Sequence, residues 1–304
     1  MKPERLGLVA LLAVTVVWGT TFPAMKLLSA HLDALQIIWL RFVIALLVLT
    51  PLWWGMRSAE RRWGCALGLL LFIAFWLQIE GLARTSSNRN AFVTGLSVLV
   101  VPLIAMAVLG RRYGWQLWAA CAMACTGMAL MFHENEPWNL GDTLTLGSTV
   151  FYAVYILALE ECARRTAALP LRATRMAAAQ ASMMALASTV LLLVQGAGPE
   201  GSGLSALPPV LQQLPAAAWV ALVYLGLLAS VVVVTLQAWG QQRVDAMRSA
   251  IVFGLEPVFA ALTAWVLLGE RLGLAGVSGA ALIVAALVFS QLQPAVRPAA
   301  AAQA

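Results

Sequence analysis

The sequence predicts an all-α membrane protein in which ten transmembrane helices form two inverted five-helix repeats. The composition, the placement of basic residues and an internal similarity lead to this prediction. Of the 304 residues, 62% are hydrophobic and 11% are charged, and the mean hydropathy is +0.87. Soluble domains are about half apolar and about a quarter charged. One core cannot hide so much apolar surface from water, so the lipid bilayer is the expected solvent.

Ten apolar stretches have the length of a membrane span, which needs about 20 residues. They lie near residues 7–28, 34–54, 62–82, 88–109, 115–132, 141–160, 174–195, 217–238, 247–268 and 273–291. The first follows two basic residues, as a signal peptide does, but it runs on to Leu28 without a small-residue cleavage site and is predicted to remain as a helix. Ala197 to Pro215 reads as a Gly/Pro-rich loop, and residues 292–304 are expected to be a disordered tail.

The basic residues divide unequally between the two sides of a ten-helix chain. Fourteen lysines and arginines fall on the side that holds both termini, four fall on the other side, and Arg41 lies within a helix. Because loops rich in lysine and arginine stay in the cytoplasm, both termini of this multi-pass membrane protein are predicted to be cytoplasmic. The net charge of +6 then reflects topology, and no nucleic-acid partner is expected.

An internal similarity divides the chain into two halves. A shift of 159 residues aligns the third and fourth predicted helices with the eighth and ninth without a gap, with 16 identities in 48 positions, including Gln78 on Gln237. Five helices are an odd number, so the second half, residues 139–291, is predicted to be inverted relative to the first, residues 1–138. Inverted repeats are typical of transporters that bind their substrate near the membrane midplane. Duplication for stability alone is the alternative.

Little in the sequence points to an enzyme, a metal or a cofactor. Cys121 and Cys125 share a predicted helix face, but two sulfurs without a further ligand make a weak metal site. His31 and His133 are far apart in the sequence. No Walker loop, GxSxG motif or paired histidines occur. Neither ATP-driven transport nor hydrolysis is predicted, and no cofactor or metal is expected.

Several short motifs lie within or directly beside the predicted helices. They are Trp18 to Phe22, Arg41-Phe42, Ala91 to Leu96 with Val101 to Leu103, Gly141-Asp142, and Glu256 to Ala261 with Leu268 to Glu270. Together with the repeat, they resemble the EamA-type permeases of the drug/metabolite transporter superfamily. The first half departs from the pattern, because Arg111 stands where the second half has Glu270. The resemblance implies an inner-membrane permease that exports amino acids or related metabolites, with helices 1–4 and 6–9 around its cavity.

Glu256 is the most deeply placed charge, near the middle of the ninth predicted helix. An ionisable group at the bilayer centre costs on the order of 2.5–3.5 kcal/mol, so it usually faces a cavity or a partner. One interpretation is that Glu256 binds a substrate ammonium group or carries a proton. The other is structural: the carboxyl group caps a backbone carbonyl that Pro257 leaves unpaired.

Other polar residues within helices also have both functional and structural interpretations. Arg41 is placed to meet a substrate carboxylate, to pair with Glu80, or to extend toward the outer headgroups. Gln78 and Gln237 occupy equivalent places in the two repeats, which suits either two gates of one cavity or hydrogen bonds between helices.

Polar and aromatic side chains at helical spacing complete the candidate cavity lining. One helix face carries Thr145, Ser148, Thr149, Tyr152 and Tyr155, and others carry Thr94 with Ser97, and Trp18 with Thr21 and Phe22. Packing through hydroxyl residues is the alternative. The predicted substrate-binding residues are Trp18, Thr21, Phe22, Arg41, Gln78, Thr94, Ser97, Tyr152, Tyr155, Gln237 and Glu256.

The repeat and the polar residues within helices predict a secondary transporter that works by alternating access, and the family resemblance implies that it exports small metabolites, above all amino acids or their derivatives. The predicted partners are a small-molecule substrate and membrane lipid. The protein is expected to be a monomer or a homodimer, and coupling of transport to protons is possible. Efflux of lipophilic cations is the first alternative, against which Arg41 argues. A non-transporting enzyme or scaffold is the second, and it would need a metal cluster, a nucleophile with its base, or a soluble partner surface.

Overall fold

The computed structural model describes residues 3–131, 137–196, 203–268 and 273–291. Within these ranges the chain is helical and contains no strand. The α-helices are α1 (Pro3–Leu28), α2 (Ala34–Leu49), α3 (Ser58–Arg84), α4 (Ser87–Gly95), α5 (Ser97–Leu109), α6 (Trp115–Met131), α7 (Leu140–Arg165), α8 (Ala173–Gly196), α9 (Leu207–Gln213), α10 (Ala216–Gly226), α11 (Val233–Gln241), α12 (Ala246–Phe253), α13 (Glu256–Leu268) and α14 (Leu274–Gln291). Short 3-10 helices span Thr50–Trp53 and Gly203–Ala206, and a π-helix spans Leu227–Val232. The predicted tail, residues 292–304, lies outside the described ranges.

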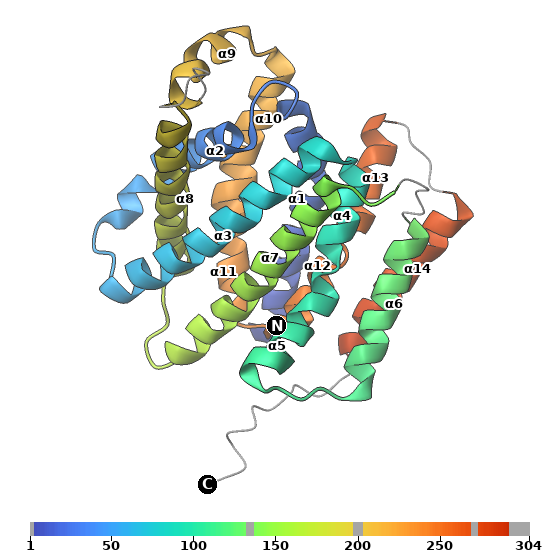
Figure 1. Ribbon diagram of the computed structural model, residues 1–304. Coiled ribbons are helices and arrows are strands. Elements are labelled where there is room, and N and C mark those ends of the chain that lie inside the picture. Colours follow the sequence, from blue (N-terminus) through green and yellow to red (C-terminus); the bar gives the residue numbers. More distant parts are fainter. Residues whose placement is uncertain (1–2, 132–136, 197–202, 269–272, 292–304) are drawn as a thin grey trace.

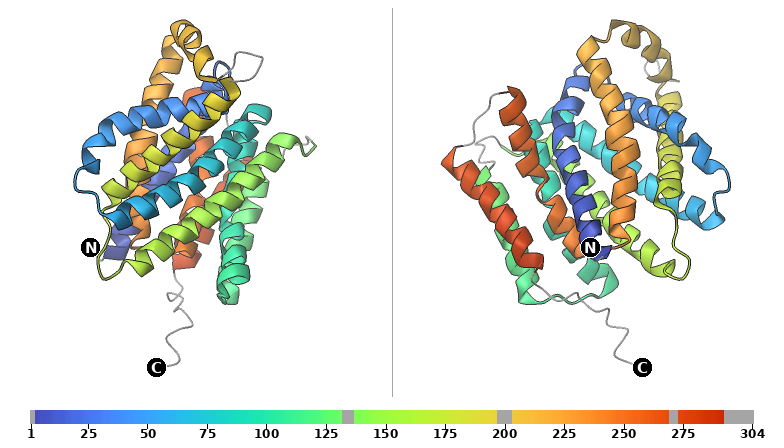
Figure 2. Two further views of the ribbon diagram at one scale, coloured as in Figure 1. Left: turned by 60° about the vertical axis from the view of Figure 1, so that its left-hand side comes forward. Right: turned by 180° about the vertical axis from the view of Figure 1, so that it is seen from behind.

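Eight segments of the described chain are long and apolar enough to cross a membrane. Four of them run through more than one element: Ala34–Trp53, Arg89–Leu109, Ala216–Gln241 and Ala246–Thr263. The shorter helices α6 and α14 lie side by side as a pair at one edge of the bundle (Figures 1 and 2). The helix α1 begins and α14 ends on the same side of the bundle (Figure 1). The chain is therefore a multi-pass membrane protein.

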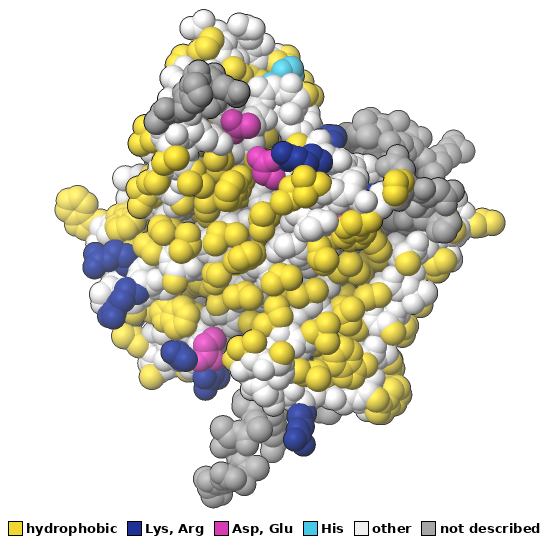
Figure 3. All heavy atoms as spheres, viewed as in Figure 1, with side chains coloured by type: hydrophobic (Ala, Val, Ile, Leu, Met, Phe, Trp, Pro, Cys, Tyr) yellow, Lys and Arg dark blue, Asp and Glu magenta, His cyan; other side chains and the backbone are white. Residues whose placement is uncertain are grey.

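The outer surface has the character of a membrane-embedded wall. Hydrophobic side chains cover the broad middle of the face in Figure 3, and the charged side chains lie in a group in its upper part and along its left and lower edges. Large apolar residues such as Leu47, Val108 and Val220 are exposed by 70% or more. Contact with lipid tails in place of water removes the cost of this exposure.

Polar caps at the loops determine where several helices begin. Asp33 accepts a hydrogen bond from the backbone N–H of Gln36 at the start of α2. Ser86 caps α4 and Asp245 caps α12 in the same way, and these two residues are 159 positions apart. Each cap satisfies a backbone donor that has no partner within the helix. The internal similarity thus extends to the residues that start two equivalent helices.

Two predicted spans, 88–109 and 247–268, are not continuous helices, although Arg89–Leu109 and Ala246–Thr263 remain long and apolar enough to cross a membrane. In the second half, α12 ends at Phe253 and α13 begins at Glu256. Proline has no N–H to continue the helical hydrogen bonds, and Pro257 lies directly after the break. The backbone N–H groups of Val258 and Phe259 both bond to the Leu255 carbonyl.

The break in the first half lies at the equivalent place but has no proline. Here α4 ends at Gly95 and α5 begins at Ser97, with the N–H of Leu96 donating to the Val93 carbonyl at 3.2 Å. The shift of 159 residues places Gly95 on Gly254, so a glycine lies at each break: Gly95 directly before the first, and Gly254 within the second. Because apolar residues surround the first break, hydropathy alone cannot reveal it.

The two breaks meet in the middle of the molecule. A Cβ atom added to Gly95 would lie 3.2 Å from Cγ of Pro257, so α4 and α13 approach closely. The helix α1 crosses α13 at Gly19, where an added Cβ would lie 2.6 Å from Cβ of Phe259. From behind, α1 lies between α10–α11 and α13 (Figure 2). Close approach through small residues is a common way to pack helices in membranes.

Candidate functional site: a central cavity

A small cavity lies where the two broken helices meet. Ten residues from seven helices line it: Trp18 and Thr21 of α1, Phe75 and Gln78 of α3, Thr94 of α4, Ser97 of α5, Tyr152 and Ile156 of α7, Phe253 of α12, and Glu256 of α13. Its volume is about 20 Å³, which is room for about one water molecule. The bundle must therefore rearrange before a metabolite can occupy this site.

The first residues of the two half-helices, Ser97 and Glu256, both line the cavity. They are 159 positions apart and so occupy equivalent places in the two repeats. Backbone N–H groups at the start of a helix lack partners within it. Transporters use such interrupted helices to present backbone groups to a substrate. Here one repeat adds a hydroxyl group at this place and the other adds a carboxyl group.

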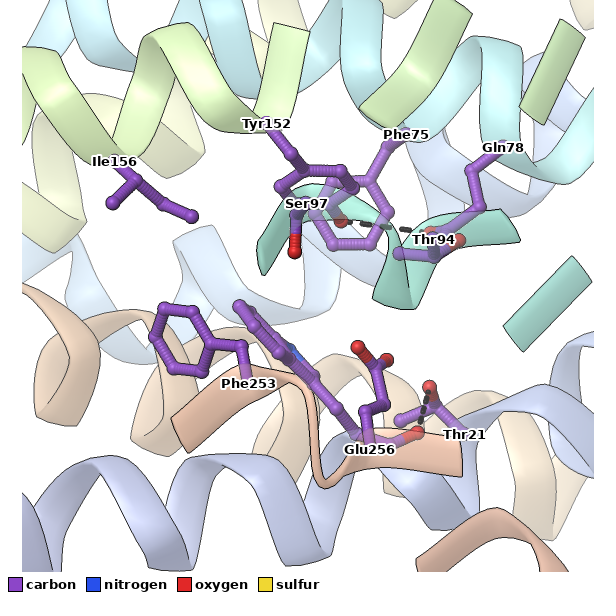
Figure 4. Close-up of a pocket in the computed structure, with 10 residues that line it drawn as sticks. Thr21, Phe75, Gln78, Thr94, Ser97, Tyr152, Ile156, Phe253 and Glu256 are labelled. Atoms are coloured by element: carbon purple, nitrogen blue, oxygen red, sulfur yellow. Dashed lines mark hydrogen bonds between the residues drawn. The ribbon is translucent and has the colours of Figure 1, made fainter. Parts of the chain in front are cut away.

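The carboxyl group of Glu256 points into the cavity (Figure 4). The residue is 5% exposed, and the described residues give its side chain neither a hydrogen bond nor an ion pair. The expected alternative, in which this group caps a carbonyl freed by Pro257, is therefore absent from the structure. A buried carboxylate without a partner is costly, so this arrangement favours a cation or a proton at the cavity.

A hydrogen-bonded network forms the polar wall opposite Glu256. Gln78 donates from Nε2 to the Thr94 hydroxyl at 3.2 Å and accepts a 3.5 Å bond from the Tyr152 hydroxyl (Figure 4). The Thr94 hydroxyl donates to the Asn90 carbonyl at 2.9 Å. These bonds join α3, α4 and α7, so they fix the direction of the amide and hydroxyl groups that the cavity presents.

Four aromatic rings form the rest of the wall. The Trp18 ring lies 5.1 Å from that of Phe253 and 6.0 Å from that of Tyr152, between ring centroids. The Phe75 ring lies 5.8 Å from that of Tyr152 and nearly edge-on to it. Aromatic faces attract cations and also bury apolar groups. The cavity therefore combines one carboxyl group, a few neutral polar groups and a large aromatic surface.

Comparison with known proteins identifies the kind of molecule that holds this cavity. A model of the EamA-like transporter family matches residues 5–133 and again residues 139–291. The chain belongs to the EamA-like transporter family. The predicted resemblance is thereby confirmed, and the protein is a membrane transporter.

Relatives of this EamA-like transporter agree in fold and general role. A protein of Archaeoglobus fulgidus (strain ATCC 49558 / DSM 4304 / JCM 9628 / NBRC 100126 / VC-16), described as an uncharacterized transporter, is 22% identical over 280 residues, which are 92% of this chain and 84% of the relative. One solved crystal structure has 19% identity and superposes with a TM-score of 0.71, covering 95% of this chain and 96% of the other. At this identity the superposition shows a shared fold.

The cavity of this EamA-like transporter brings together seven of the eleven residues that the sequence singles out. They are Trp18, Thr21, Gln78, Thr94, Ser97, Tyr152 and Glu256. Phe22 packs in the hydrophobic core instead. Tyr155 is fully buried and donates a 2.8 Å hydrogen bond to Gln180. Gln237 is also fully buried, and its amide donates to Gln241 at 3.3 Å.

The polar face of α7 divides between the two predicted roles. Tyr152 lines the cavity, whereas Thr145 accepts a 2.7 Å bond from Asn90, and Thr149 donates to the Val93 carbonyl at 3.0 Å. The threonines thus join helices, as the packing alternative predicts, and the tyrosine faces the cavity.

Three apolar lining residues, Phe75, Ile156 and Phe253, were missed by the sequence analysis. Their side chains do not stand out among many other apolar residues of the helices. The repeat offers a signal for one of them, because a shift of 159 residues places Thr94 on Phe253.

Arg41 of α2 lies beside the cavity and not at the membrane border. It is 1% exposed, and its Nε donates a 2.9 Å hydrogen bond to the Ser230 hydroxyl. The possible partner Glu80 instead pairs with Arg84 one turn further along α3. Both the predicted ion pair with Glu80 and the predicted extension toward the headgroups are therefore wrong for this structure. Glu80 and Arg84 are four residues apart on α3, so their pair forms within one helix and leaves Arg41 without this carboxylate.

Proposed function

We propose that this chain is a secondary transporter that exports small metabolites, above all amino acids or their derivatives, across the cytoplasmic membrane. Its ten spans form two inverted five-helix repeats, residues 1–138 and 139–291, with both termini in the cytoplasm. The observation that carries the proposal is the unpaired Glu256 carboxyl group, which faces a cavity between two broken helices at equivalent positions. An ammonium group is the cation that such a carboxylate binds in a metabolite.

Alternating access requires a seal on each side of the cavity. Where α1 ends, Arg89 pairs with the buried Asp142 at 2.8 Å. Where α1 begins, Arg248 pairs with Glu4 and Asp245. Arg89 and Arg248 are equivalent in the repeat. We interpret these ion pairs as matched contacts that hold the two faces closed in turn, while the halves rock about the cavity.

The aromatic rings around Glu256 favour efflux of lipophilic cations as a second candidate function. Trp18, Tyr152 and Phe253 lie within one group of ring contacts beside the carboxyl group. A delocalised cation would gain from both the charge and the ring faces. In this case the transported molecule would need no anionic group.

Counterflow in proteoliposomes tests the proposal and separates the two candidates. We expect vesicles preloaded with unlabelled amino acids to accumulate the labelled amino acid, with aromatic and large apolar side chains preferred because of the cavity lining. Lipophilic cations such as ethidium should then compete weakly. Strong counterflow of ethidium without counterflow of any amino acid would favour the second candidate. A panel in which nothing exchanges would contradict both.

A further inference from the structure

Arg41 holds a positive charge inside the bundle without an anion. Its guanidinium Nη2 has no hydrogen-bond partner, and Nη1 meets only the sulfur of Met25, at 3.9 Å. The described residues place no carboxylate within ion-pair distance of Arg41. Burying a charge costs several kcal/mol unless a partner compensates it. The structure therefore contains a fully buried cation with free donors.

Phe75 is the residue that separates this cation from the cavity. The Cζ atom of Arg41 lies 4.6 Å from the centroid of the Phe75 ring, and 5.2 Å from that of Phe42. Phe75 also lines the cavity and contacts Tyr152 there. One aromatic ring thus stands between the guanidinium group and the space that Glu256 faces. Rotation of that ring would bring the donors of Arg41 to the cavity.

The side-chain hydroxyl of Ser230 holds the guanidinium group in this place. Ser230 accepts the bond from Nε of Arg41 and donates its own hydroxyl to the Leu225 carbonyl at 2.8 Å. It lies in the π-helix Leu227–Val232, and such segments occur often at functional sites. The Arg41 side chain is therefore positioned by a bond at one end, while its other end keeps unused donors.

From this geometry we infer that Arg41 forms an anion subsite of the cavity and that Phe75 covers it when no substrate is present. The inference rests on the proposed function and specifies its substrate class. In this arrangement the cationic amine of the substrate binds Glu256. Its carboxylate displaces the Phe75 ring and binds the planar guanidinium group of Arg41. A guanidinium group suits a carboxylate because two parallel N–H donors match its two oxygens.

Transport of a matched pair of probes tests this inference. Phenylalanine and 2-phenylethylamine differ only in the carboxylate group, and both fit an aromatic cavity. We expect the wild-type protein to prefer phenylalanine in counterflow and Arg41→Gln to lose that preference, with the ratio of the two rates falling about tenfold or more. A hydrogen bond between charged groups contributes about 1.5–3 kcal/mol, which corresponds to a tenfold effect or more.

Three further variants keep the result interpretable. Arg41→Lys retains the charge and should retain part of the preference, even if Arg41→Gln folds poorly. Ser230→Ala removes the positioning bond, along with the bond to the Leu225 carbonyl, but keeps Arg41, and it should lower the ratio less. Arg112→Gln removes an arginine from an exposed loop and should leave the ratio unchanged.

The outcomes distinguish the inference from the function on which it rests. Equal losses of both probes in Arg41→Gln and Arg41→Lys would overturn the subsite, because they would show a structural role alone. An unchanged ratio in Arg41→Gln would overturn it as well. A wild-type protein that exchanges neither probe nor any other amino acid would overturn the proposed function, and the subsite with it.

Discussion

Glu256→Gln is expected to lower transport by about 30-fold or more. The amide keeps the size of the side chain but loses the negative charge that the cavity presents to a cationic group. Losing one partner of a buried charge pair costs about 2–5 kcal/mol, and the described lining holds no second carboxylate. The measurement is counterflow of a labelled amino acid in proteoliposomes. Any pH dependence of the wild-type rate that comes from this carboxylate should disappear in the variant.

Two controls accompany this variant. Ser97→Ala changes the equivalent residue of the other repeat and removes only a hydroxyl group, so a smaller loss is expected. Glu161→Gln removes a carboxylate that pairs with Arg164 and Arg165 at the end of α7, and transport should persist. Unchanged flux in Glu256→Gln across the pH range would remove this residue from the mechanism.

Asp142→Asn should destabilise the protein strongly, by about 3–5 kcal/mol, because it leaves a cation without its buried partner. Asp142 is fully buried, pairs with Arg89 at 2.8 Å and accepts a 3.1 Å hydrogen bond from Thr85. Its carboxylate also accepts the backbone N–H of Asn139, which starts α7. The asparagine can keep one of these bonds but not the charge. Thermal unfolding in detergent measures the change.

The equivalent contact on the other face supplies a matched control. Glu4, the partner of Arg248, has a side chain that is 49% exposed. Exposed ion pairs contribute about 0–1 kcal/mol, so Glu4→Gln should change stability little. Comparable losses of stability in the two variants would mean that the buried ion pair stabilises the protein no more than the exposed one. The interpretation of Arg89 and Asp142 as a seal would then fail.

Membrane class was predictable from this sequence because it depends on sums over many residues, and the family was predictable because its short motifs and the internal repeat extend along most of the chain. Long apolar stretches identify spans wherever they occur. The breaks at Leu96 and at Gly254-Leu255 were not predictable from hydropathy, since the residues at a break are as apolar as the helix around it. Pro257 gave a signal for the second break, and the repeat transfers that signal to the first.

The cavity was predictable where its lining is polar. Gln78, Thr94 and Glu256 stand out in apolar helices because polar groups are costly there. Phe75 and Phe253 do not, because an aromatic residue that faces a cavity looks like one that packs in the core. The surroundings of Arg41 were also hidden, since Ser230 is 189 positions away in the sequence and meets Arg41 only through the packing of α2 against the π-helix.

The central claim is that two inverted halves expose one cavity to each side of the membrane in turn. Reaction of Ser97→Cys with a membrane-impermeant thiol reagent tests it, in a protein whose four native cysteines are replaced by alanine. In oriented vesicles, Ser97→Cys is predicted to react from either side, and substrate should alter both rates. Arg112→Cys should react from the cytoplasmic side only and His31→Cys from the opposite side only. Reaction of Ser97→Cys from one side alone, or from neither, would contradict the account.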